Sequence, residues 1–212
     1  MIKTSISILD CDFNNLQGEI KKINLTNANL IHIDIMDGSF VNNNTIKKFD
    51  MDTLSKYSNK KFDVHLMVDK PENHIEKYIT PLTKFISIHL ESKGDINKSL
   101  VKIRESNIKS GLAINPDSKI SDLHKFIDLV DMVIIMSVYP GKGGQKFINK
   151  TFDRVKELRE KFNNIDISVD GGVDSSNSHK LISNGASTLV SGSFLMKSDN
   201  INNSIKNMLK EW

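Results

Sequence analysis

Runs of β-branched and other apolar residues recur along the chain, and each is followed by a stretch that mixes polar and apolar residues with helical spacing. Short runs of this composition predict strands, and the mixed stretches predict helices. The predicted strands are TSISIL (4–9), LIHIDI (30–35), FDVHLMV (62–68), FISIHL (85–90), SGLAI (110–114), MVIIMSV (132–138), IDISVD (165–170) and STLVSG (187–192). The predicted helices cover residues 13–27, 72–79, 96–107, 121–128, 151–162, 176–184 and 200–211.

Some helix ends carry the residues that usually cap them. DSSN (174–177) offers N-cap side chains just before SHKLISNG (178–185), and Gly185 stands where a helix C-cap is expected. NLTNAN (24–29) is a polar stretch of the kind that ends a helix, and it follows the first predicted one. These signals support helices between the predicted strands.

Eight predicted strands separated by helices indicate a parallel sheet, because parallel neighbours need crossover connections about as long as a helix. Eight such units in 212 residues favour an α/β fold, a single-domain (β/α)8 TIM barrel over residues 1–212. A doubly wound open sheet is the alternative. It calls for a glycine fingerprint after the first strand, and ILDCDFNN (8–15) contains no glycine.

Polar side chains stand at the carboxyl ends of three predicted strands. Because side chains alternate along a strand, His32, Asp34 and Met36 share one face. His65 lies at the matching place on the third strand, and Asp170 ends the seventh. The carboxyl ends of barrel strands form the face on which barrel enzymes carry out their chemistry. We therefore expect these side chains to lie together at one end of the barrel.

Each of these residues alone would pass as an ordinary core or capping residue, and it is the set of two His and two Asp that favours a metal site. Buried carboxylates need compensation, which a cation with imidazole ligands supplies. The set suits one divalent metal ion, with zinc, iron(II), manganese and cobalt left open. Two carboxylates on opposite sides of the barrel would suit two-base proton transfer, with the metal holding a carbonyl and stabilising an enediolate.

Glycine-rich loops follow the last three strands. They are YPGKGGQKF (139–147), DGG (170–172) and SGS (191–193). Backbone N–H groups in such loops can bind phosphate, and barrels often hold phosphate at this place, although each loop alone could be only a turn. Met36, Met67 and Met136 stand near the same end, where they either line a pocket or fill the core.

Composition narrows the class of protein. The formal charge is +3, with Lys and Glu interleaved and no basic block, so we expect no nucleic-acid partner. Cys11 is the one cysteine, which excludes an intramolecular disulfide and indicates a reducing compartment. No signal-peptide pattern is present, and no apolar run approaches the roughly 18 residues of a membrane span. The sequence predicts a cytoplasmic protein without membrane contact.

Six motifs occur in a fixed order from about residue 4 to residue 196, nearly the whole chain. They are SIL (7–9) with DF (12–13), HIDIMDGSFV (32–41), DVHLMV (63–68), MSVYPGKGGQKF (136–147), VDGGV (169–173) and SGS (191–193). Together they closely resemble the ribulose-phosphate 3-epimerase family. The resemblance implies an isomerase, a metal-dependent (β/α)8 barrel of the pentose phosphate pathway that interconverts D-ribulose 5-phosphate and D-xylulose 5-phosphate.

The resemblance also implies roles for residues, carried over position by position. The metal ligands would be His32, Asp34, His65 and Asp170, with Asp34 as proton acceptor and Asp170 as donor in one direction. Met36, Met67 and Met136 would pack around the intermediate. The residues implied to bind the sugar phosphate are Ser7, His65, Gly141, Lys142, Gly143, Gly144, Asp170, Gly171, Gly172, Gly192 and Ser193. Family members generally associate, which implies a homo-oligomer.

The chain departs from the family pattern in four places. Ile6 stands where Pro is usual, and NNNTIKKF (42–49) replaces a stretch that tends to read PNLTIGP. Tyr139 stands where Asn is usual, and Lys142 where an aromatic or apolar residue is usual. None of these changes removes an implied ligand or base, and they bear on loop closure and on the choice of sugar phosphate. Lys142 suggests the hypothesis of an added phosphate contact.

Rival functions remain open to different degrees. Allulose-6-phosphate 3-epimerase would keep the same metal and carboxylates, and only an assay separates it. Decarboxylase-type phosphate barrels typically carry Asp-x-Lys-x-x-Asp at strand three, whereas residues 63–68 read DVHLMV. A Schiff-base aldolase needs a strand-end lysine, which no predicted strand has. A non-catalytic phosphate-binding barrel is disfavoured because Asp34, Asp170 and both histidines are all present.

Overall fold

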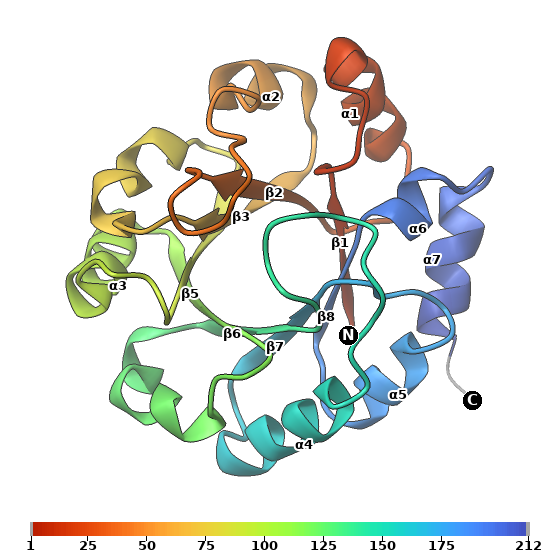
Figure 1. Ribbon diagram of the computed structural model, residues 1–212. Helices are drawn as coiled ribbons and strands as arrows, with labels where there is room; N and C mark the ends of the chain where they lie inside the picture. The colour runs from red at the N-terminus through yellow and green to blue at the C-terminus, as the bar shows by residue number, and fades with distance from the viewer. Residues whose placement is uncertain (1, 211–212) are drawn as a thin grey trace.

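The computed structural model describes residues 2–210, and eight parallel strands in it close into a barrel (Figure 1). Each strand pairs with the next, and the last pairs with the first. The strands are β1 (Lys3–Ser7), β2 (Leu30–Met36), β3 (Lys61–Met67), β4 (Thr83–His89), β5 (Lys109–Ile114), β6 (Met132–Met136), β7 (Asp166–Asp170) and β8 (Thr188–Ser191). The predicted (β/α)8 barrel is confirmed, and the open sheet is excluded.

Helices surround the barrel and cover its outer face (Figure 1). The α-helices are α1 (Leu16–Asn24), α2 (Met51–Tyr57), α3 (Ile96–Glu105), α4 (Thr151–Lys161), α5 (Ser178–Ser183), α6 (Ser193–Met196) and α7 (Ile201–Leu209). Shorter 3₁₀ helices are η1 (Phe13–Asn15), η2 (Pro71–Asn73), η3 (Ile75–Tyr78), η4 (Ile120–Lys125) and η5 (Ile127–Leu129).

Several predicted helices are shorter or of another type. The helix predicted at 13–27 is η1 followed by α1, which ends at Asn24. The helices predicted at 72–79 and 121–128 are wrong as α-helices, because each folds as two 3₁₀ segments. The end of the helix predicted at 200–211 lies outside the described residues, and α2 and α6 were not predicted.

The helix predicted at 176–184 is α5, and its ends bear out the capping signals only in part. Gly185 follows it with φ +110°, and its N–H donates to the carbonyl of Ile182. A residue with a side chain would be strained there, which explains the glycine. At the other end, Asn177 is the N-cap, but its side chain donates to the Gly172 carbonyl and accepts from the Asp174 N–H instead of capping the helix.

Strand alternation divides the apolar core into two parts. Outward-facing residues such as Ile31, Ile33 and Ile35 are fully buried between the strands and the helices. Inward-facing residues such as Leu30, Phe85 and several others form a smaller cluster inside the barrel. Burial of the outward-facing residues, between the strands and the helices, supplies most of the hydrophobic stabilisation. The interior is left partly to polar side chains.

The register of the parallel strands decides which inward-facing side chains are neighbours. His32 of β2 pairs with Asp63 of β3, and Asp34 pairs with His65. On the other side of the barrel, Met136 of β6 pairs with Asp170. All eight strands run in the same direction, so these residues gather near one end of the barrel.

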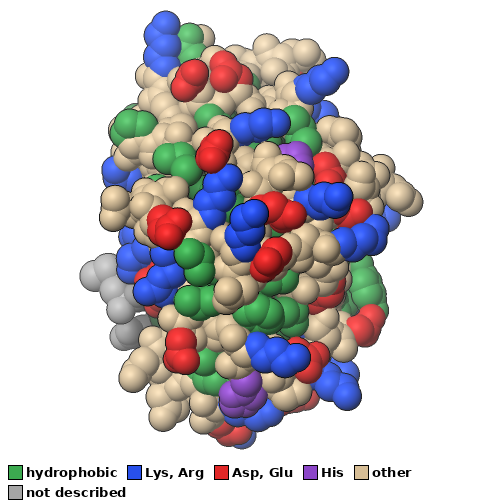
Figure 2. All heavy atoms as spheres, turned by 90° about the vertical axis from the view of Figure 1, so that its left-hand side faces the viewer, with side chains coloured by type: hydrophobic (Ala, Val, Ile, Leu, Met, Phe, Trp, Pro, Cys, Tyr) green, Lys and Arg blue, Asp and Glu red, His purple; other side chains and the backbone are tan. Residues whose placement is uncertain are grey.

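The surface carries charged side chains of both signs (Figure 2). Figure 2 shows the face that carries α3, where Lys and Arg side chains are interspersed with Asp and Glu and no extended patch of one sign forms. Within residues 2–210, none of the helices has the length and apolar character needed to span a membrane.

Candidate active site

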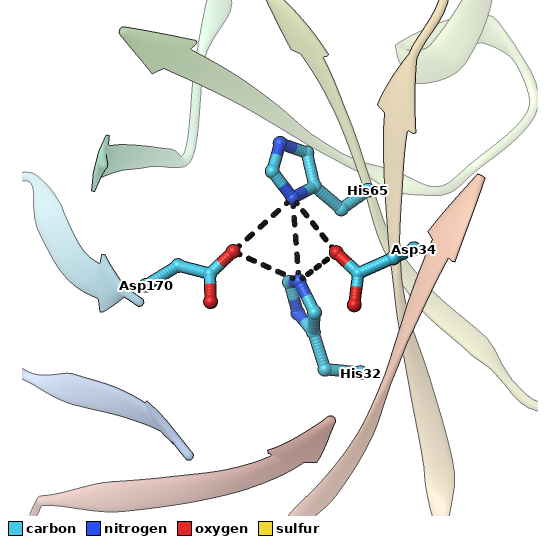
Figure 3. A group of neighbouring side chains, drawn as sticks. All are labelled: His32, Asp34, His65 and Asp170. Carbon is cyan, nitrogen blue, oxygen red and sulfur yellow. Dashed lines mark hydrogen bonds and ion pairs between the residues drawn. The ribbon is translucent and has the colours of Figure 1, made fainter. Parts of the chain in front are cut away.

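Four side chains from β2, β3 and β7 converge inside one end of the barrel (Figure 3). His32 Nε2 lies 3.3 Å from Asp34 Oδ1 and 3.4 Å from Asp170 Oδ2. His65 Nδ1 lies 3.4 Å from each of the same two oxygens and 3.3 Å from His32 Nε2. The two carboxylates approach the imidazoles from opposite sides (Figure 3). The sequence prediction that these four residues lie together therefore matches their positions.

Their placement follows from strand geometry and burial. His32 and His65 are fully buried, Asp34 is 4% exposed, and the Asp170 side chain is 13% exposed. The two histidines therefore form the floor of the site. The carboxylates stand one step closer to solvent.

The donor set fits a divalent metal ion. One atom from each residue, an imidazole nitrogen or a carboxylate oxygen, lies within 4.8 Å of the other three. Among the described residues, the ion pairs of Asp34 and Asp170 are with His32 and His65 alone. Two largely buried carboxylates without Lys or Arg partners call for another positive charge. Two nitrogens with two oxygens suit zinc and its neighbours in the first transition row.

The proximity of opposite charges dominates the electrostatics. Burial lowers the pKa of His32, but the carboxylates of Asp34, Asp63 and Asp170 outweigh it and raise that pKa well above 6.5. Burial raises the pKa of Asp34, yet His32 and His65 hold it far below its ordinary value. The pKa of Asp170 is lowered as well, although burial and the charge of Asp34 both oppose this. The two imidazoles thus stabilise the ionised form of both carboxyl groups.

Residues behind the cluster hold its members in place. Asp63 Oδ2 lies 2.8 Å from His32 Nδ1 and accepts a hydrogen bond of 3.2 Å from Ser5 Oγ. Ser7 Oγ donates to Asp34 Oδ2 at 2.8 Å, which leaves Oδ1 facing the imidazoles. Ser5, Ser7 and Asp63 are buried. Hydrogen bonds of this kind orient metal ligands and fix which ring nitrogen carries the proton.

His65 is supported by a series of contacts that runs through two further side chains. Its Nε2 lies 2.9 Å from Nε2 of His89, which is fully buried at the end of β4. Nδ1 of His89 lies 3.1 Å from Glu91 Oε2. Burial lowers the pKa of His89 to about 4, with His65 acting in the same direction and Glu91 against it. A neutral ring is therefore favoured at position 89.

A cavity of about 520 Å³, counted with its part open to solvent, lies over the cluster. The predicted site residues on its wall are Ser7, Asp34, Met36, Met67, Met136, Gly141, Lys142, Gly143, Gly144, Asp170, Gly171, Gly172, Gly192 and Ser193. His32 and His65 lie below it and are not among the described lining residues.

The loop that follows β6, residues 137–150, closes one side of this cavity and arches across the barrel end (Figure 1). Asn43 Nδ2 donates to the Gly141 carbonyl at 3.0 Å, so the loop is tied to the segment after β2. Gln145 Nε2 donates to the carbonyls of Tyr139 and Lys142 at 2.7 and 2.9 Å. The loop thus has its own internal support.

Sequence reasoning missed several residues of the site. Asp63, His89 and Glu91 were not selected, and neither were the cavity residues Asp10 and Gln145. A signal was present for His89, because it stands at the carboxyl end of a predicted strand like the residues that were chosen. Asp63 stands two residues before His65 on the same strand, so both side chains face the barrel interior. Asp10 and Gln145 lie in loops, where alternation gives no information.

Comparisons with known proteins identify the family of this chain. The sequence model of the ribulose-phosphate 3 epimerase family matches residues 3–196. The chloroplastic ribulose-5-phosphate-3-epimerase of Arabidopsis thaliana is 38% identical over 198 residues, which cover 91% of this chain and 70% of the relative. The ribulose-phosphate 3-epimerase of Bacillus subtilis is 35% identical over 198 residues, which cover 91% of each.

Solved structures show the same fold in proteins with other names. The 3-hexulose-6-phosphate synthase from Salmonella typhimurium aligns with a TM-score of 0.70, over 98% of this chain and 96% of that one. Its sequence is only 11% identical, so the likeness concerns the fold alone. The sequence relatives are more specific, because they carry the name of one isomerase over nearly the full chain. The chain belongs to the ribulose-phosphate 3 epimerase family.

Proposed function

We propose that this protein interconverts D-ribulose 5-phosphate and D-xylulose 5-phosphate by moving the proton on C3 of the sugar between two carboxylates. The observation that carries the proposal is the placement of Asp34 and Asp170. Both line the cavity, both face the same two imidazoles, and they approach from opposite sides. Inversion at one carbon needs a proton taken from one face and another delivered to the opposite face.

In this scheme, Asp34 accepts the proton in one direction and Asp170 donates one, and the roles exchange in the reverse direction. The hydrogen bond from Ser7 Oγ to Asp34 Oδ2 holds that carboxylate in one orientation. His32 and His65 hold the pKa values of both Asp34 and Asp170 below the ordinary value, so Asp34 starts as the carboxylate that the acceptor role requires.

The proposed metal ligands are His32 Nε2, Asp34 Oδ1, His65 Nδ1 and Asp170 Oδ2. A divalent ion bound there would polarise the ketone carbonyl and stabilise the negative charge that develops when the neighbouring carbon loses its proton. Zinc, iron(II), manganese and cobalt all suit two imidazoles and two carboxylates. The histidines, which lie beneath the carboxylates, would keep the ion at the floor of the cavity.

The remaining cavity residues are proposed to bind the rest of the substrate. Gly141, Gly144, Gly171 and Gly172 have positive φ, so their loops adopt turns that bring backbone groups to the cavity. We assign the phosphate to this side, with Lys142 as an added positive charge. The methionine residues on the wall, Met36, Met67 and Met136, would pack against the sugar carbons and exclude water. Ser7 and His65 are proposed to contact the sugar.

The proposal is tested by measuring turnover of D-ribulose 5-phosphate and of allulose 6-phosphate on one preparation whose metal content is known. We expect faster turnover of the pentose phosphate. Asp34→Asn and Asp170→Asn should each lower kcat by at least about 1,000-fold with the fold intact, because each removes one proton carrier. Appreciable turnover in both variants would refute the two-carboxylate scheme. A preference for allulose 6-phosphate would reassign the substrate.

We also propose a homo-oligomer and a cytoplasmic location. The single buried thiol of Cys11 is in keeping with a reducing compartment. Light scattering of the purified protein would give the oligomeric state, and a mass equal to one chain would contradict this part of the proposal. Fractionation of the source cells would give the location.

A further inference from the structure

The ring of His65 is held from both sides. Its Nδ1 faces Asp34 and Asp170, and its Nε2 lies 2.9 Å from Nε2 of His89. Both rings are fully buried, so no bulk water competes for these nitrogens. The contact between two ring nitrogens is informative, because one of them must carry a hydrogen and the other must offer a lone pair.

Metal binding decides the direction of that hydrogen bond. If His65 binds a metal through Nδ1, that nitrogen carries no hydrogen, and the hydrogen of the neutral ring is on Nε2. His65 then donates to Nε2 of His89, which must be the acceptor. A neutral His89 in turn carries its own hydrogen on Nδ1. That nitrogen lies 3.1 Å from Glu91 Oε2.

Glu91 is suited to end this chain because a carboxylate only accepts hydrogen bonds. Its Oε1 accepts from the backbone N–H of Asn115 at 2.9 Å and from Ser118 Oγ. Its Oε2 is thereby left to accept from His89. The Glu91 side chain is 25% exposed, so this series of hydrogen bonds runs from the buried cluster to the edge of the barrel.

We propose that Glu91, acting through His89, is a positioning residue that fixes the hydrogen of His65 on Nε2 and so keeps Nδ1 free to bind metal. This inference rests on the proposed metal site. His32 offers an internal comparison, since its outer nitrogen, Nδ1, contacts the carboxylate of Asp63 directly at 2.8 Å. One histidine has a carboxylate beside it, and the other reaches a carboxylate through a second imidazole.

Glu91→Gln tests the direction of the chain with almost no change of shape. The N–H of Asn115 needs an acceptor, so the amide oxygen of Gln takes the place of Oε1 and the amide NH₂ faces His89. His89 Nδ1 must then accept, which moves the hydrogen of His89 to Nε2. His65 would have to accept at Nε2 and carry its own hydrogen on Nδ1, where the metal should bind.

The measurements are the zinc dissociation constant, from competition with a chromophoric chelator, and the ring nitrogen NMR spectrum of the zinc-loaded protein. In the unsubstituted protein we expect hydrogens on His65 Nε2 and His89 Nδ1. Glu91→Gln should weaken zinc binding by about 10- to 100-fold, the range found when a partner of a ligand is lost. Zinc affinity within about twofold of the unsubstituted protein, or a hydrogen on His89 Nε2 in the zinc-loaded protein, would overturn the inference.

A matched pair at position 89 gives an independent test should Glu91→Gln fail to fold. His89→Gln keeps the direction, because its oxygen accepts from His65 and its NH₂ donates to Glu91. His89→Leu offers no acceptor. We expect His89→Gln to bind zinc within a few fold of the unsubstituted protein and His89→Leu to lose about 10- to 100-fold. Equal affinities for the two variants would contradict the role of His89.

The outcome is separable from that of the proposed function. A protein that binds zinc and responds to these substitutions, yet turns over neither sugar phosphate, would reject the proposed function and retain the positioning role. A protein that turns over ribulose 5-phosphate but gives equal zinc affinities for all variants would do the reverse. Absence of zinc binding in the unsubstituted protein would overturn the inference itself.

Discussion

At this site, residues of the same type differ in their position and in the groups that they contact. Asp34 and Asp63 lie on adjacent strands and both contact His32, but Asp34 lines the cavity and Asp63 is fully buried below it. Alternation along the strands predicted His32, Asp34, His65 and Asp170, because it places them on one face at strand ends. Alternation alone could not tell which of two aspartates lines the cavity and which lies buried below it, because the depth of a side chain in the barrel depends on strand register.

Lys142 is one of the departures from the family pattern, and it lines the cavity in the loop after β6. If its charge contacts the substrate phosphate, Lys142→Ala should raise KM by about 2- to 5-fold and leave kcat nearly unchanged, since an exposed charge pair contributes up to about 1 kcal/mol. Steady-state kinetics checks this. Lys156→Ala, which removes an exposed charge from α4, is the control and should leave KM unchanged. An unchanged KM in Lys142→Ala would contradict the phosphate contact.

Cys11 follows β1 and is 8% exposed. Burial, with the charges of Glu19 and Asp12, raises the pKa of its thiol to about 12. A raised pKa keeps the reactive thiolate scarce, so at about pH 8 we expect alkylation by iodoacetamide about 1,000-fold slower in the folded protein than in urea. Mass spectrometry of the labelled chain over time measures both rates. Similar rates in the two states would contradict the burial of this thiol.

At the scale of elements, the eight strands were predictable because their apolar runs are short, β-branched and bounded by polar stretches. Connections were harder. The helix α2 (Met51–Tyr57) has only seven residues and buries Met51 and Leu54, which is too few for a periodic signal. The stretches at 72–79 and 121–128 contain apolar residues at helical spacing, and each folds as two 3₁₀ segments. A 3₁₀ helix repeats every three residues, so over a short stretch its pattern differs little from that of an α-helix.

Two glycines of the cavity loops separate backbone conformation from crowding. Gly144 and Gly172 have similar φ, +65° and +63°. A Cβ at Gly144 would meet nothing within 4 Å, whereas at Gly172 it would lie 2.8 Å from the Gln145 carbonyl oxygen and 2.9 Å from the Phe147 nitrogen. Gly144→Ala should cost about 1–2 kcal/mol of unfolding free energy for strain alone. Gly172→Ala should lose about 1–3 kcal/mol more, because backbone cannot move aside easily.

Urea unfolding of both variants and of the unsubstituted protein measures the difference. The comparison is well matched because both residues lie in loops that line the same cavity. Equal losses would mean that the loop after β6 moves away from Gly172 readily. In that case the contact between these loops would not hold the cavity wall in place.

For the whole molecule, the apolar layer around the barrel stabilises the fold, and the polar cluster inside one end of the barrel opposes that stabilisation. Two imidazoles and the Asp34 carboxylate are buried at the end of the barrel beside the largely buried Asp170, and bringing these groups there from water has a cost. A metal ion that binds only the folded state would offset this cost. The structure therefore predicts that stability depends on metal supply, and not only activity.

Zinc added at about 100 times its dissociation constant should stabilise the folded protein by about 2.7 kcal/mol, which corresponds to a rise in Tm of about 5–10 °C for a chain of this size. Thermal unfolding of chelator-treated protein, with and without zinc, measures the shift. The double variant His32→Gln/Asp170→Asn loses two of the four proposed ligands and should show no zinc-dependent rise. The same rise in that variant would place the bound zinc elsewhere. No rise in the unsubstituted protein would show that the four side chains balance their charges without a metal, and the metal role would then have to be abandoned along with the stabilisation.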